Sequence, residues 1–369
     1  MNIGGPAIQI TGLMQNLSPS DFEQILLTGH CEKNELDYLE EREIKLPKIQ
    51  LNGFGRSINF FADLKACFEI RKVIKTYSPD IIHTHTTKAG LLGRLAAISS
   101  FQDQIRVHTY HGHLLHGYFG IVKTNLLIWI ESFLARYTDA LIAVGEKVRD
   151  DLIAAGIGES QQYRVIAPGL KVGELISRDL ALQTFDLPKD KFIVAWIGRV
   201  VAVKSPNRVI QLAIECRSRG SNVHFVVVGD GPLLGELKNR AELLSLPISF
   251  LGWQSEIEVA LSFSDLVILT SENEGTPVAL IQAQLAGIPV LSTDVGSVSE
   301  VLIDEKSGFC LSYSTRDFAD RIDILSKNNE MKNSFGVIGK KNAIEKFSLS
   351  RLVTDHEALY RDLISQSNF

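Results

Sequence analysis

Short apolar runs alternate with longer helical patterns along the 369-residue sequence, and this alternation leaves few possible architectures. Apolar runs bounded by helical segments are typical of strands that are buried on both faces of a parallel sheet. The first group of predicted strands comprises residues 25–27, 81–82, 107–109 and 140–143, with helices at 61–74 and 89–98. The second group comprises residues 192–197, 223–228, 248–251, 266–269 and 289–292. The sequence therefore predicts an α/β fold of two doubly wound parallel-sheet domains.

The two domains are assigned to residues 1–175 and 176–348. A C-terminal helix of about 349–369 is expected to pack back on the first domain. The turn Gly4-Gly5-Pro6 opens the chain, although such a turn normally follows the first, central strand of the sheet. The first N-terminal strand is therefore predicted to be missing, and we expect a reading frame that begins upstream or an unstable form.

Composition and charge argue against nucleic acid as the main partner and indicate where the protein is located. The net charge of −5 argues against nucleic acid as the main partner, because binding to phosphates normally needs a basic surface. The four cysteines are scattered without a C-x-x-C pair, which is typical of free thiols in a reducing compartment. We expect no signal peptide, because no such pattern opens the sequence, and no apolar run reaches the roughly 18 residues of a spanning helix. We expect a cytoplasmic protein that can lie at the inner face of the membrane.

One segment keeps a peripheral membrane contact open. Residues 126–134 are apolar on nearly all sides and include Trp129 and Phe133. We expect this helix to lie in the core, as most helices of this composition do. A membrane-facing helix is the alternative.

Two cations follow the predicted strand at 192–197. Arg199 and Lys204 stand where the carboxyl end of a parallel strand meets the ligand in open α/β sheets. A guanidinium and an ammonium five residues apart can clamp a diphosphate. The alternative is two solvated loop cations.

The stretch from Ser271 to Pro277 follows the predicted strand at 266–269. Thr276 suits a helix N-cap and Pro277 suits the first helical position. The free amides of Val278 and its successor then form an anion site, with Glu274 beside it to accept hydrogen bonds from sugar hydroxyls. The alternative is an ordinary capped helix with an exposed glutamate.

Glycine turns and histidines supply further candidates. The Gly4-Gly5 turn can bring backbone amides to a phosphate, or it can be a plain strand-to-helix turn. The turn at 229–232 lacks the third glycine of a dinucleotide fingerprint, so we interpret it as a tight strand-to-helix turn.

Six histidines cluster at His83, His85, His108, His111, His113 and His116. H-x-H on a strand places both rings on one face, which suits a metal, but no carboxylate is interleaved and hydrogen bonding is favoured.

Taken in order, these stretches make the chain resemble the retaining glycosyltransferases of family 4, which have the GT-B fold of two facing Rossmann-like domains. The resemblance runs from Gly4 to about Glu345. It rests on the order and spacing of residues 4–6, 79–94, 108–120, 198–206, 229–232 and 271–287.

The resemblance implies roles for individual residues. The Gly5 amide would bind the donor diphosphate, and Arg199 and Lys204 would neutralise it in place of a metal ion. Glu274 matches the first glutamate of the E-x7-E motif, which contacts the donor sugar. His111 matches the histidine after the fourth strand of the N-terminal domain, near the reaction centre. The nucleotide sugar is a co-substrate, and neither a cofactor nor a metal is expected.

Position 282 departs from the family pattern. The second glutamate of E-x7-E binds the ribose hydroxyls, and this chain has Gln282 in its place. A glutamine offers one neutral acceptor and a donor group. Gln284 cannot substitute, because two residues further along a helix it faces elsewhere.

The resemblance therefore predicts a metal-independent, retaining glycosyltransferase of the hexosyl or N-acetylhexosaminyl type. It would hold a nucleotide sugar, a UDP-sugar, between its domains and transfer the sugar to a saccharide or lipid-linked saccharide in surface polysaccharide biosynthesis. One alternative is a nucleotide-sugar epimerase of similar fold, which would need a paired acid and base. The other is a non-catalytic or truncated nucleotide-sugar-binding remnant, which Gln282 and the missing strand favour.

Overall fold

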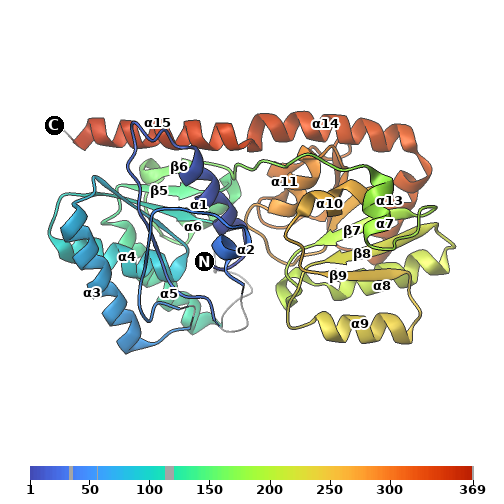
Figure 1. Cartoon of the computed structure of the whole chain (residues 1–369), viewed down its shortest axis with the longest axis horizontal. Coiled ribbons are helices and arrows are strands. Elements are labelled where there is room, and N and C mark those ends of the chain that lie inside the picture. The colour runs from blue at the N-terminus through green and yellow to red at the C-terminus, as the bar shows by residue number, and fades with distance from the viewer. Residues whose placement is uncertain (33–35, 56, 113–119, 368–369) are drawn as a thin grey trace. The chain divides into compact units, whose positions relative to one another are not determined.

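A computed structural model of the chain describes residues 1–32, 36–55, 57–112 and 120–367. The chain forms two compact units (Figure 1). Unit 1 comprises Met1–Gly169 and Leu349–Phe369, and unit 2 comprises Leu170–Ser348. Each unit contains parallel strands covered by helices, so the predicted α/β class is confirmed.

Unit 2 is built on one fully parallel sheet of six strands. These are β7 (Phe192–Ile197), β8 (Val223–Val228), β9 (Ile248–Gly252), β10 (Leu266–Leu269), β11 (Val290–Thr293) and β12 (Gly308–Leu311). Their order across the sheet is β12-β11-β10-β7-β8-β9, the order of a Rossmann-type sheet. β7, β8, β10 and β11 are almost entirely buried, because helices cover both faces, whereas the edge strand β9 is half-buried along its length.

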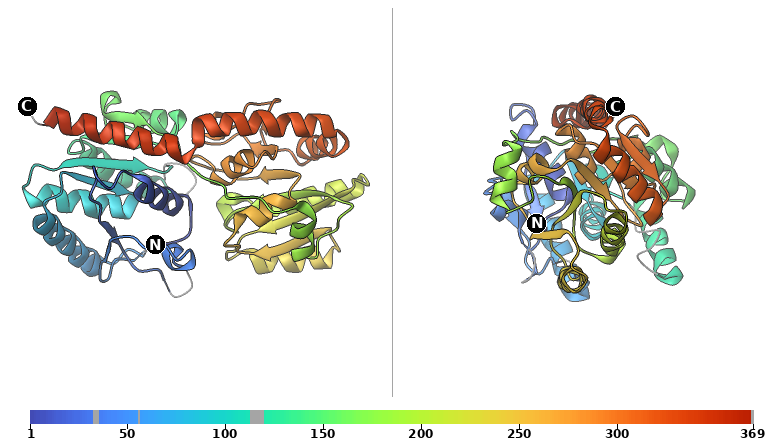
Figure 2. Two further views of the ribbon diagram at one scale, coloured as in Figure 1. Left: turned by 45° about the horizontal axis from the view of Figure 1, so that its top comes forward. Right: turned by 90° about the vertical axis from the view of Figure 1, so that its right-hand side faces the viewer.

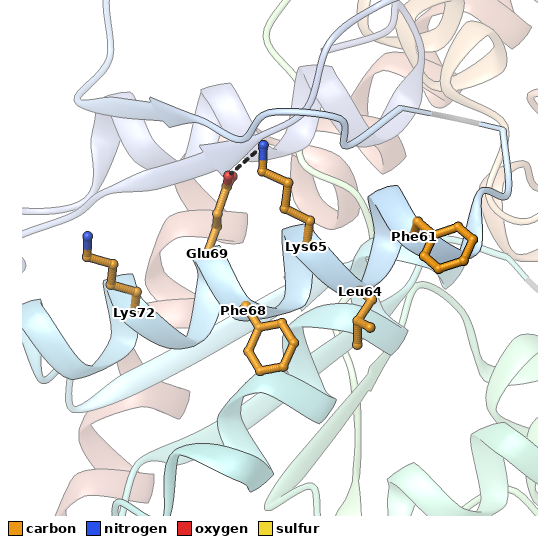
Figure 3. Close-up of a pocket in the computed structure, with 6 residues that line it drawn as sticks. All are labelled: Phe61, Leu64, Lys65, Phe68, Glu69 and Lys72. Atoms are coloured by element: carbon orange, nitrogen blue, oxygen red, sulfur yellow. Dashed lines mark ion pairs between the residues drawn. The ribbon is translucent and has the colours of Figure 1, made fainter.

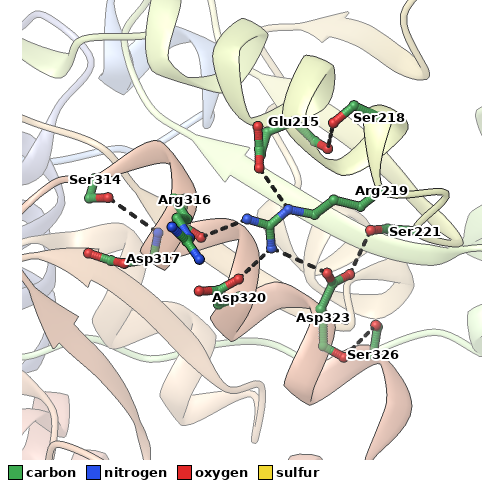
Figure 4. Close-up of polar contacts among 10 residues, drawn as sticks. All are labelled: Glu215, Ser218, Arg219, Ser221, Ser314, Arg316, Asp317, Asp320, Asp323 and Ser326. Carbon is green, nitrogen blue, oxygen red and sulfur yellow. Dashed lines mark hydrogen bonds and ion pairs between the residues drawn. The ribbon is translucent and has the colours of Figure 1, made fainter.

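Eight α-helices surround this sheet in the described part of unit 2. They are α7 (Arg178–Thr184), α8 (Asn207–Ser218), α9 (Leu234–Leu243), α10 (Ile257–Phe263), α11 (Val278–Leu285), α12 (Val298–Val301), α13 (Thr315–Lys327) and α14 (Asn329–Phe347). Helices α8, α9 and α13 bury apolar side chains against one face of the sheet. Arg219, just after α8, joins α13 by ion pairs to Asp320 at 2.5 Å and Asp323 at 3.5 Å (Figure 4). These contacts hold α8 and α13 side by side.

Unit 1 has its strands in two separate parallel sheets. The smaller sheet pairs β1 (Leu26–Thr28) with β2 (Lys48–Gln50). The larger sheet has the order β3 (Ile81–His85), β4 (Ile105–Tyr110), β5 (Ala140–Ala143) and β6 (Tyr163–Val165). Among the described residues no strand precedes the first helix, and Asn2 makes only an isolated antiparallel bridge to Asp37.

The helices of unit 1 lie on both faces of the larger sheet. They are α1 (Gly5–Asn16), α2 (Tyr38–Glu41), α3 (Phe60–Tyr77), α4 (Thr87–Ser100), α5 (Ile121–Ala135), α6 (Glu146–Ala154) and α15 (Leu349–Ser367). Helices α3, α4, α5 and α6 pack on the face that carries Ile82 and Leu141. Helix α15 packs on the opposite face, against Ile105, Val107 and their neighbours (Figure 2).

The helix at 126–134 lies only partly in the core, so that expectation is wrong for its outer face. Leu126, Trp129 and Phe133 on α5 are exposed, and the buried side of this helix carries Glu131 together with Leu134. The reason is that Glu131 forms a buried ion pair with Arg94 of α4, which turns the apolar side chains outward. No helix in the described part of the chain is both long and apolar enough to span a bilayer.

Two helical glycines of unit 2 allow a matched test of how closely α14 packs against the turn at Gly287. A Cβ on Gly336 of α14 would lie 2.2 Å from the carbonyl oxygen of Gly287, whereas the Cβ position of Gly235 on α9 faces open space. We expect Gly336→Ala to lower the free energy of unfolding by at least about 1 kcal/mol through overpacking. Gly235→Ala should raise it by about 0.5–1 kcal/mol, because alanine loses less backbone entropy in a helix. Urea denaturation measures both, and a Gly336→Ala protein as stable as the parent would contradict the close approach.

Candidate active site

The candidate site of unit 2 lies where the strand order of the sheet reverses. β7 pairs with β8 on one side and with β10 on the other, so the connections that follow β7 and β10 diverge. Open α/β sheets bind ligands in the crevice outside the carboxyl ends of strands at such a point. The loop after β7 carries Arg199 and Lys204, and the loop after β10 carries Glu274.

Two glycines support the loop that carries Arg199. A Cβ on Gly229 would lie 1.9 Å from the carbonyl oxygen of Gly198, and a Cβ on Gly231 would lie 2.4 Å from that of Val200. A side chain at either of these two glycine positions would displace the loop after β7. The turn at 229–232 therefore acts as a packing surface for the Arg199 loop.

Lys204 and Glu274 meet although they are far apart in sequence. The Nζ of Lys204 lies 2.5 Å from Oε1 of Glu274, and the hydroxyl of Ser271 donates to the same oxygen at 2.6 Å. Only 7% of the Glu274 side chain is exposed, so its charge needs these partners to offset its desolvation. The structure thus brings together the predicted diphosphate-binding lysine and the predicted sugar-binding glutamate.

A buried threonine that the sequence analysis missed holds the two loops together. The indole Nε1 of Trp196 in β7 donates to Oγ1 of Thr270 at 2.9 Å. The same hydroxyl lies 3.2 Å from the carbonyl oxygens of Lys204 and Ser205, to which it can donate. Thr270 therefore joins β7, the end of β10 and the Lys204 loop. The sequence signal that could have identified Thr270 is its position directly after the apolar strand β10.

Helix α11 begins one residue later than predicted. Its first residue is Val278, and Pro277 is the N-cap, with an extended backbone and no side-chain cap bond. The prediction that Thr276 is the N-cap is therefore wrong, because Pro277 does not enter the first turn. The amides of Val278 and Ala279 still open the helix and lack partners within it.

The two glutamines of α11 face different environments. Gln282, one turn after Val278, is half-buried. Gln284 is fully buried and donates to the carbonyl oxygen of Val301 at 3.0 Å. Gln284 thus faces away from Val278, as predicted, and the structure adds that it is buried in the core, whereas Gln282 shares the side of Val278.

Arg199 differs from Lys204 in its surroundings. Its side chain is exposed. Within the part of the chain that the structure describes, its guanidinium forms no ion pair or hydrogen bond. Its five N–H donors are therefore open to an anion at the carboxyl edge of β7.

In unit 1, β3 places His83 and His85 on one face of the sheet, as the H-x-H spacing predicts. Their rings stack with centroids 4.1 Å apart. His85 Nδ1 lies 3.0 Å from His111 Nε2, so the two rings share a hydrogen bond. The predicted cluster members His113 and His116 lie outside the described residues.

The C-terminal helix completes this histidine group. Both ring nitrogens of His83 form hydrogen bonds, Nδ1 with the hydroxyl of Tyr360 at 2.6 Å and Nε2 with the hydroxyl of Thr109 at 2.7 Å. His356 of α15 also stacks near His83, with ring centroids 5.8 Å apart. Sequence reasoning missed His356 and Tyr360, because no local pattern connects α15 to β3.

Burial keeps these rings neutral. Burial, together with the nearby His356, lowers the pKa of His111 to about 3. Burial also holds the pKa of His85 well below its ordinary value. His111 can therefore act at neutral pH as a neutral hydrogen-bonding group.

The remaining predicted features of unit 1 concern an anion and a metal. Gly5 is the first residue of α1, so its amide lies at the positive end of a helix. Among the described residues, no three histidine, cysteine or acidic side chains are grouped so that they could hold a metal ion. The roles of Gly5 and metal independence stay predictions.

The two halves of the chain match two families of known proteins. Residues 3–173 match the family described as Glycosyltransferase Family 4. Residues 177–342 match the family described as Glycosyl transferases group 1. The boundary between the matches falls within a few residues of the start of unit 2.

Relatives and a solved structure extend this similarity. The chain is 28% identical over 341 residues to the UDP-Gal:alpha-D-GlcNAc-diphosphoundecaprenol alpha-1,3-galactosyltransferase of Escherichia coli, covering 86% of each chain. It is 24% identical to the capsular polysaccharide biosynthesis glycosyltransferase CapM of Staphylococcus aureus, covering 85% of this chain and 84% of CapM. Sucrose-phosphate synthase from Thermosynechococcus elongatus has a similar structure, with a TM-score of 0.82 at 18% identity over 98% of this chain and 94% of that one. The last likeness shows a GT-B fold.

Two buried histidines of unit 1 should make the stability of the fold depend on pH. Burial lowers the pKa of His108 well below its ordinary value and that of His356 to about 4. In the unfolded chain both return to about 6.5, so the unfolded state binds more protons below that pH. Stability should therefore fall as the pH falls from about 6.5 toward about 4, by about 1 kcal/mol per histidine between about pH 7.5 and about pH 5.5.

Chemical denaturation at these two pH values measures the effect. His356→Gln keeps a hydrogen-bonding side chain without the titrating ring, so it should reduce the loss of stability on acidification. A chain that is more stable at the lower pH, or a variant with an unchanged pH dependence, would contradict the assignment.

Proposed function

Because the chain carries a family 4 glycosyltransferase domain followed by a group 1 glycosyltransferase domain in the GT-B fold, we propose that it is a metal-independent, retaining glycosyltransferase. Its donor is a UDP-sugar, and it transfers a hexose or N-acetylhexosamine. Its acceptor is a saccharide or lipid-linked saccharide of a surface polysaccharide. The Escherichia coli relative, named for UDP-Gal and a diphosphoundecaprenol-linked acceptor, supports both substrate classes, and CapM supports the pathway.

The observation that carries the proposal is the meeting of Lys204 and Glu274 at the switch point of the sheet. Sugar transfer breaks the bond between the anomeric carbon and a diphosphate oxygen, so negative charge grows on the leaving diphosphate. A catalyst must stabilise that charge with groups that are already in place. Lys204 is fixed by its contact with Glu274, and Arg199 follows β7 at the same edge. An ammonium and a guanidinium can together supply the charge that other transferases take from a metal ion.

The remaining groups orient the donor. The amide of Val278 opens α11 and can donate to the diphosphate, with Thr276 beside it. The Oε1 of Glu274 already accepts from Lys204 and Ser271, which fixes the carboxylate so that Oε2 can accept from a sugar hydroxyl. From unit 1 we assign the Gly5 amide to the diphosphate and the neutral His111 ring to the donor sugar. No cofactor takes part.

The proposed acceptor implies a place of action. A saccharide on a lipid carrier stays at a membrane surface, while UDP-sugars are dissolved in the cytoplasm. We therefore propose that the protein acts in the cytoplasm at the inner face of the membrane. Nucleic acid is not expected as a partner, because the chain has a net charge of −5.

The diphosphate clamp can be tested by removing one cation at a time. Arg199→Ala or Lys204→Ala should lower turnover more than about ten-fold, because charged hydrogen bonds contribute roughly 1.5–3 kcal/mol. Arg240→Ala, which removes an exposed cation of α9, is the matched control and should keep full turnover. Activity should also survive EDTA. Complete loss in chelator that a divalent ion restores would overturn metal independence.

Gln282 should limit donor affinity rather than turnover. A carboxylate at this position would accept the ribose hydroxyls through charge-assisted bonds, which are about twice as strong as neutral ones. Gln282→Glu should therefore lower the donor KM several-fold, or by about 1 kcal/mol, with little change in kcat. Glu274→Gln should instead lower kcat. Weaker donor binding by Gln282→Glu would show that the site is built around the amide and would sink the ribose assignment.

A further inference from the structure

Unit 1 turns large apolar side chains outward on two helices. On α5 they recur once per turn, and on α3 they occupy the first two turns and the start of the third. Exposed apolar residues include Val122, Leu126, Trp129 and Phe133 on α5, and Phe60, Phe61, Leu64 and Phe68 on α3. Together they are called the α3/α5 surface. Phe61 is 81% exposed and Trp129 68% exposed, so these rings are not edges of a core.

The orientation of α5 is fixed by a buried charge pair. Glu131 lies 2.6 Å from a guanidinium nitrogen of Arg94 in α4, and the hydroxyl of Tyr110 donates to the same carboxylate oxygen at 2.9 Å. Breaking such a pair would leave an uncompensated buried charge, so α5 cannot turn its apolar face inward without a large penalty. A helix in contact with water alone buries apolar side chains and exposes charged ones. α5 buries Glu131 beside Leu134 and Ala135, and it exposes four large apolar side chains, which indicates an apolar partner on its outer face.

The two helices belong to one layer of unit 1. Both contact α4, and all three pack on the same face of the larger sheet. In a parallel sheet the helices that follow the strands begin at the carboxyl edge. The edge where α3 and α5 begin is therefore the edge where β3 ends at His85 and β4 leads to His111.

The charges around the α3/α5 surface are mainly positive. Figure 3 shows Lys65 and Lys72 on α3 together with Phe61, Leu64 and Phe68, and it also shows Glu69, whose carboxylate lies 3.9 Å from the ammonium of Lys65. Further exposed cations are Lys75 at the end of α3, Lys123 on α5 and Arg136 just after it. Glu131 is the one acidic residue in the sequence of α5, and it is buried. This local excess of cations stands out in a chain with a net charge of −5.

We propose that the α3/α5 surface docks unit 1 onto an anionic lipid bilayer. Phenylalanine, tryptophan and leucine side chains enter the interface between headgroups and acyl chains, while the surrounding lysines bind lipid phosphates. The inference rests on the proposed function in one respect: a lipid-linked acceptor would be reached at the edge that carries His85 and His111. The binding to lipid itself follows from the surface alone.

Vesicle flotation with the full chain tests the proposal, using phosphatidylcholine vesicles with and without phosphatidylglycerol. Wild type should float with the anionic vesicles and less with the neutral ones. Phe61→Ser with Trp129→Ser should lower the partition coefficient at least about ten-fold, because two large apolar side chains leave the bilayer. Lys65→Glu with Lys72→Glu should lower binding to anionic vesicles by at least about five-fold per residue and hardly change binding to neutral ones.

The matched control is Leu243→Ser with Val337→Ser, which removes two side chains of unit 2 that are 85% and 72% exposed. This control should float like wild type. Equal loss in the control, or full binding by the aromatic variant, would overturn the proposal. So would a concentration-dependent dimer, seen by sedimentation without vesicles, that the aromatic variant abolishes while vesicle binding persists. That result would assign the surface to a second copy of the chain.

Binding of UDP to the same preparations, followed by thermal shift, separates this proposal from the enzymatic one. Each surface variant should bind UDP as wild type does, which also shows that it is folded. UDP binding without vesicle binding would overturn the docking surface and leave the enzymatic proposal intact. Vesicle binding without UDP binding would overturn the enzymatic proposal and leave the docking surface intact.

Discussion

The pairing of β7 with β10 determines what unit 2 can bind. Parallel pairing brings the carboxyl ends of both strands to one edge, and the reversal of strand order sends their connections apart. The space between these connections is bounded by the Lys204 loop and the Glu274 loop. Thr270 holds both, since its hydroxyl accepts from Trp196 and lies within 3.2 Å of two carbonyl oxygens of the Lys204 loop. A cation and a carboxylate are thereby fixed at the sheet edge before any ligand arrives.

Unit 1 distributes polarity in an unusual way. Its interior contains stacked histidines and the Arg94–Glu131 pair, while its outer helices expose phenylalanine, tryptophan and leucine. Buried polar groups are tolerated where they have partners, as His83 has in Tyr360 and Thr109 and Glu131 has in Arg94 and Tyr110. The exposed aromatic rings have no such explanation within the chain. The buried charge pair sets the rotation of α5 and so accounts for the apolar side chains that this helix exposes.

Much of the fold could be predicted from local patterns. Strands of continuous apolar residues, such as Phe192–Ile197 and Ala140–Ala143, were predicted with the bounds that the structure shows. Strand β2 was missed because Lys48–Gln50 has exposed polar ends, and β6 because Tyr163–Val165 is three residues long with an exposed arginine at its centre. Strand β12 was missed because Gly308–Leu311 is short and begins with glycine. The order of the strands depends on pairing between distant segments, which no local pattern reveals.

The candidate site was predictable where one loop carries the chemistry and not where distant segments meet. Arg199, Lys204 and Glu274 could be singled out because each follows an apolar strand. The contact between Lys204 and Glu274, the role of Thr270 and the approach of Tyr360 to His83 need the tertiary fold. The N-cap of α11 was placed one residue early, because Thr-Pro suits a cap in general while Pro277 here stays extended.

The central claim is that the carboxyl edge at β7 and β10 binds the diphosphate of a nucleotide donor. A crystal structure of the chain with UDP tests it most directly. We expect the diphosphate to lie within hydrogen-bonding distance of Arg199 and Lys204, with the amide of Val278 facing it and the ribose near Gln282. A diphosphate bound away from this edge, or held by a metal ion that excludes Arg199 and Lys204, would contradict it.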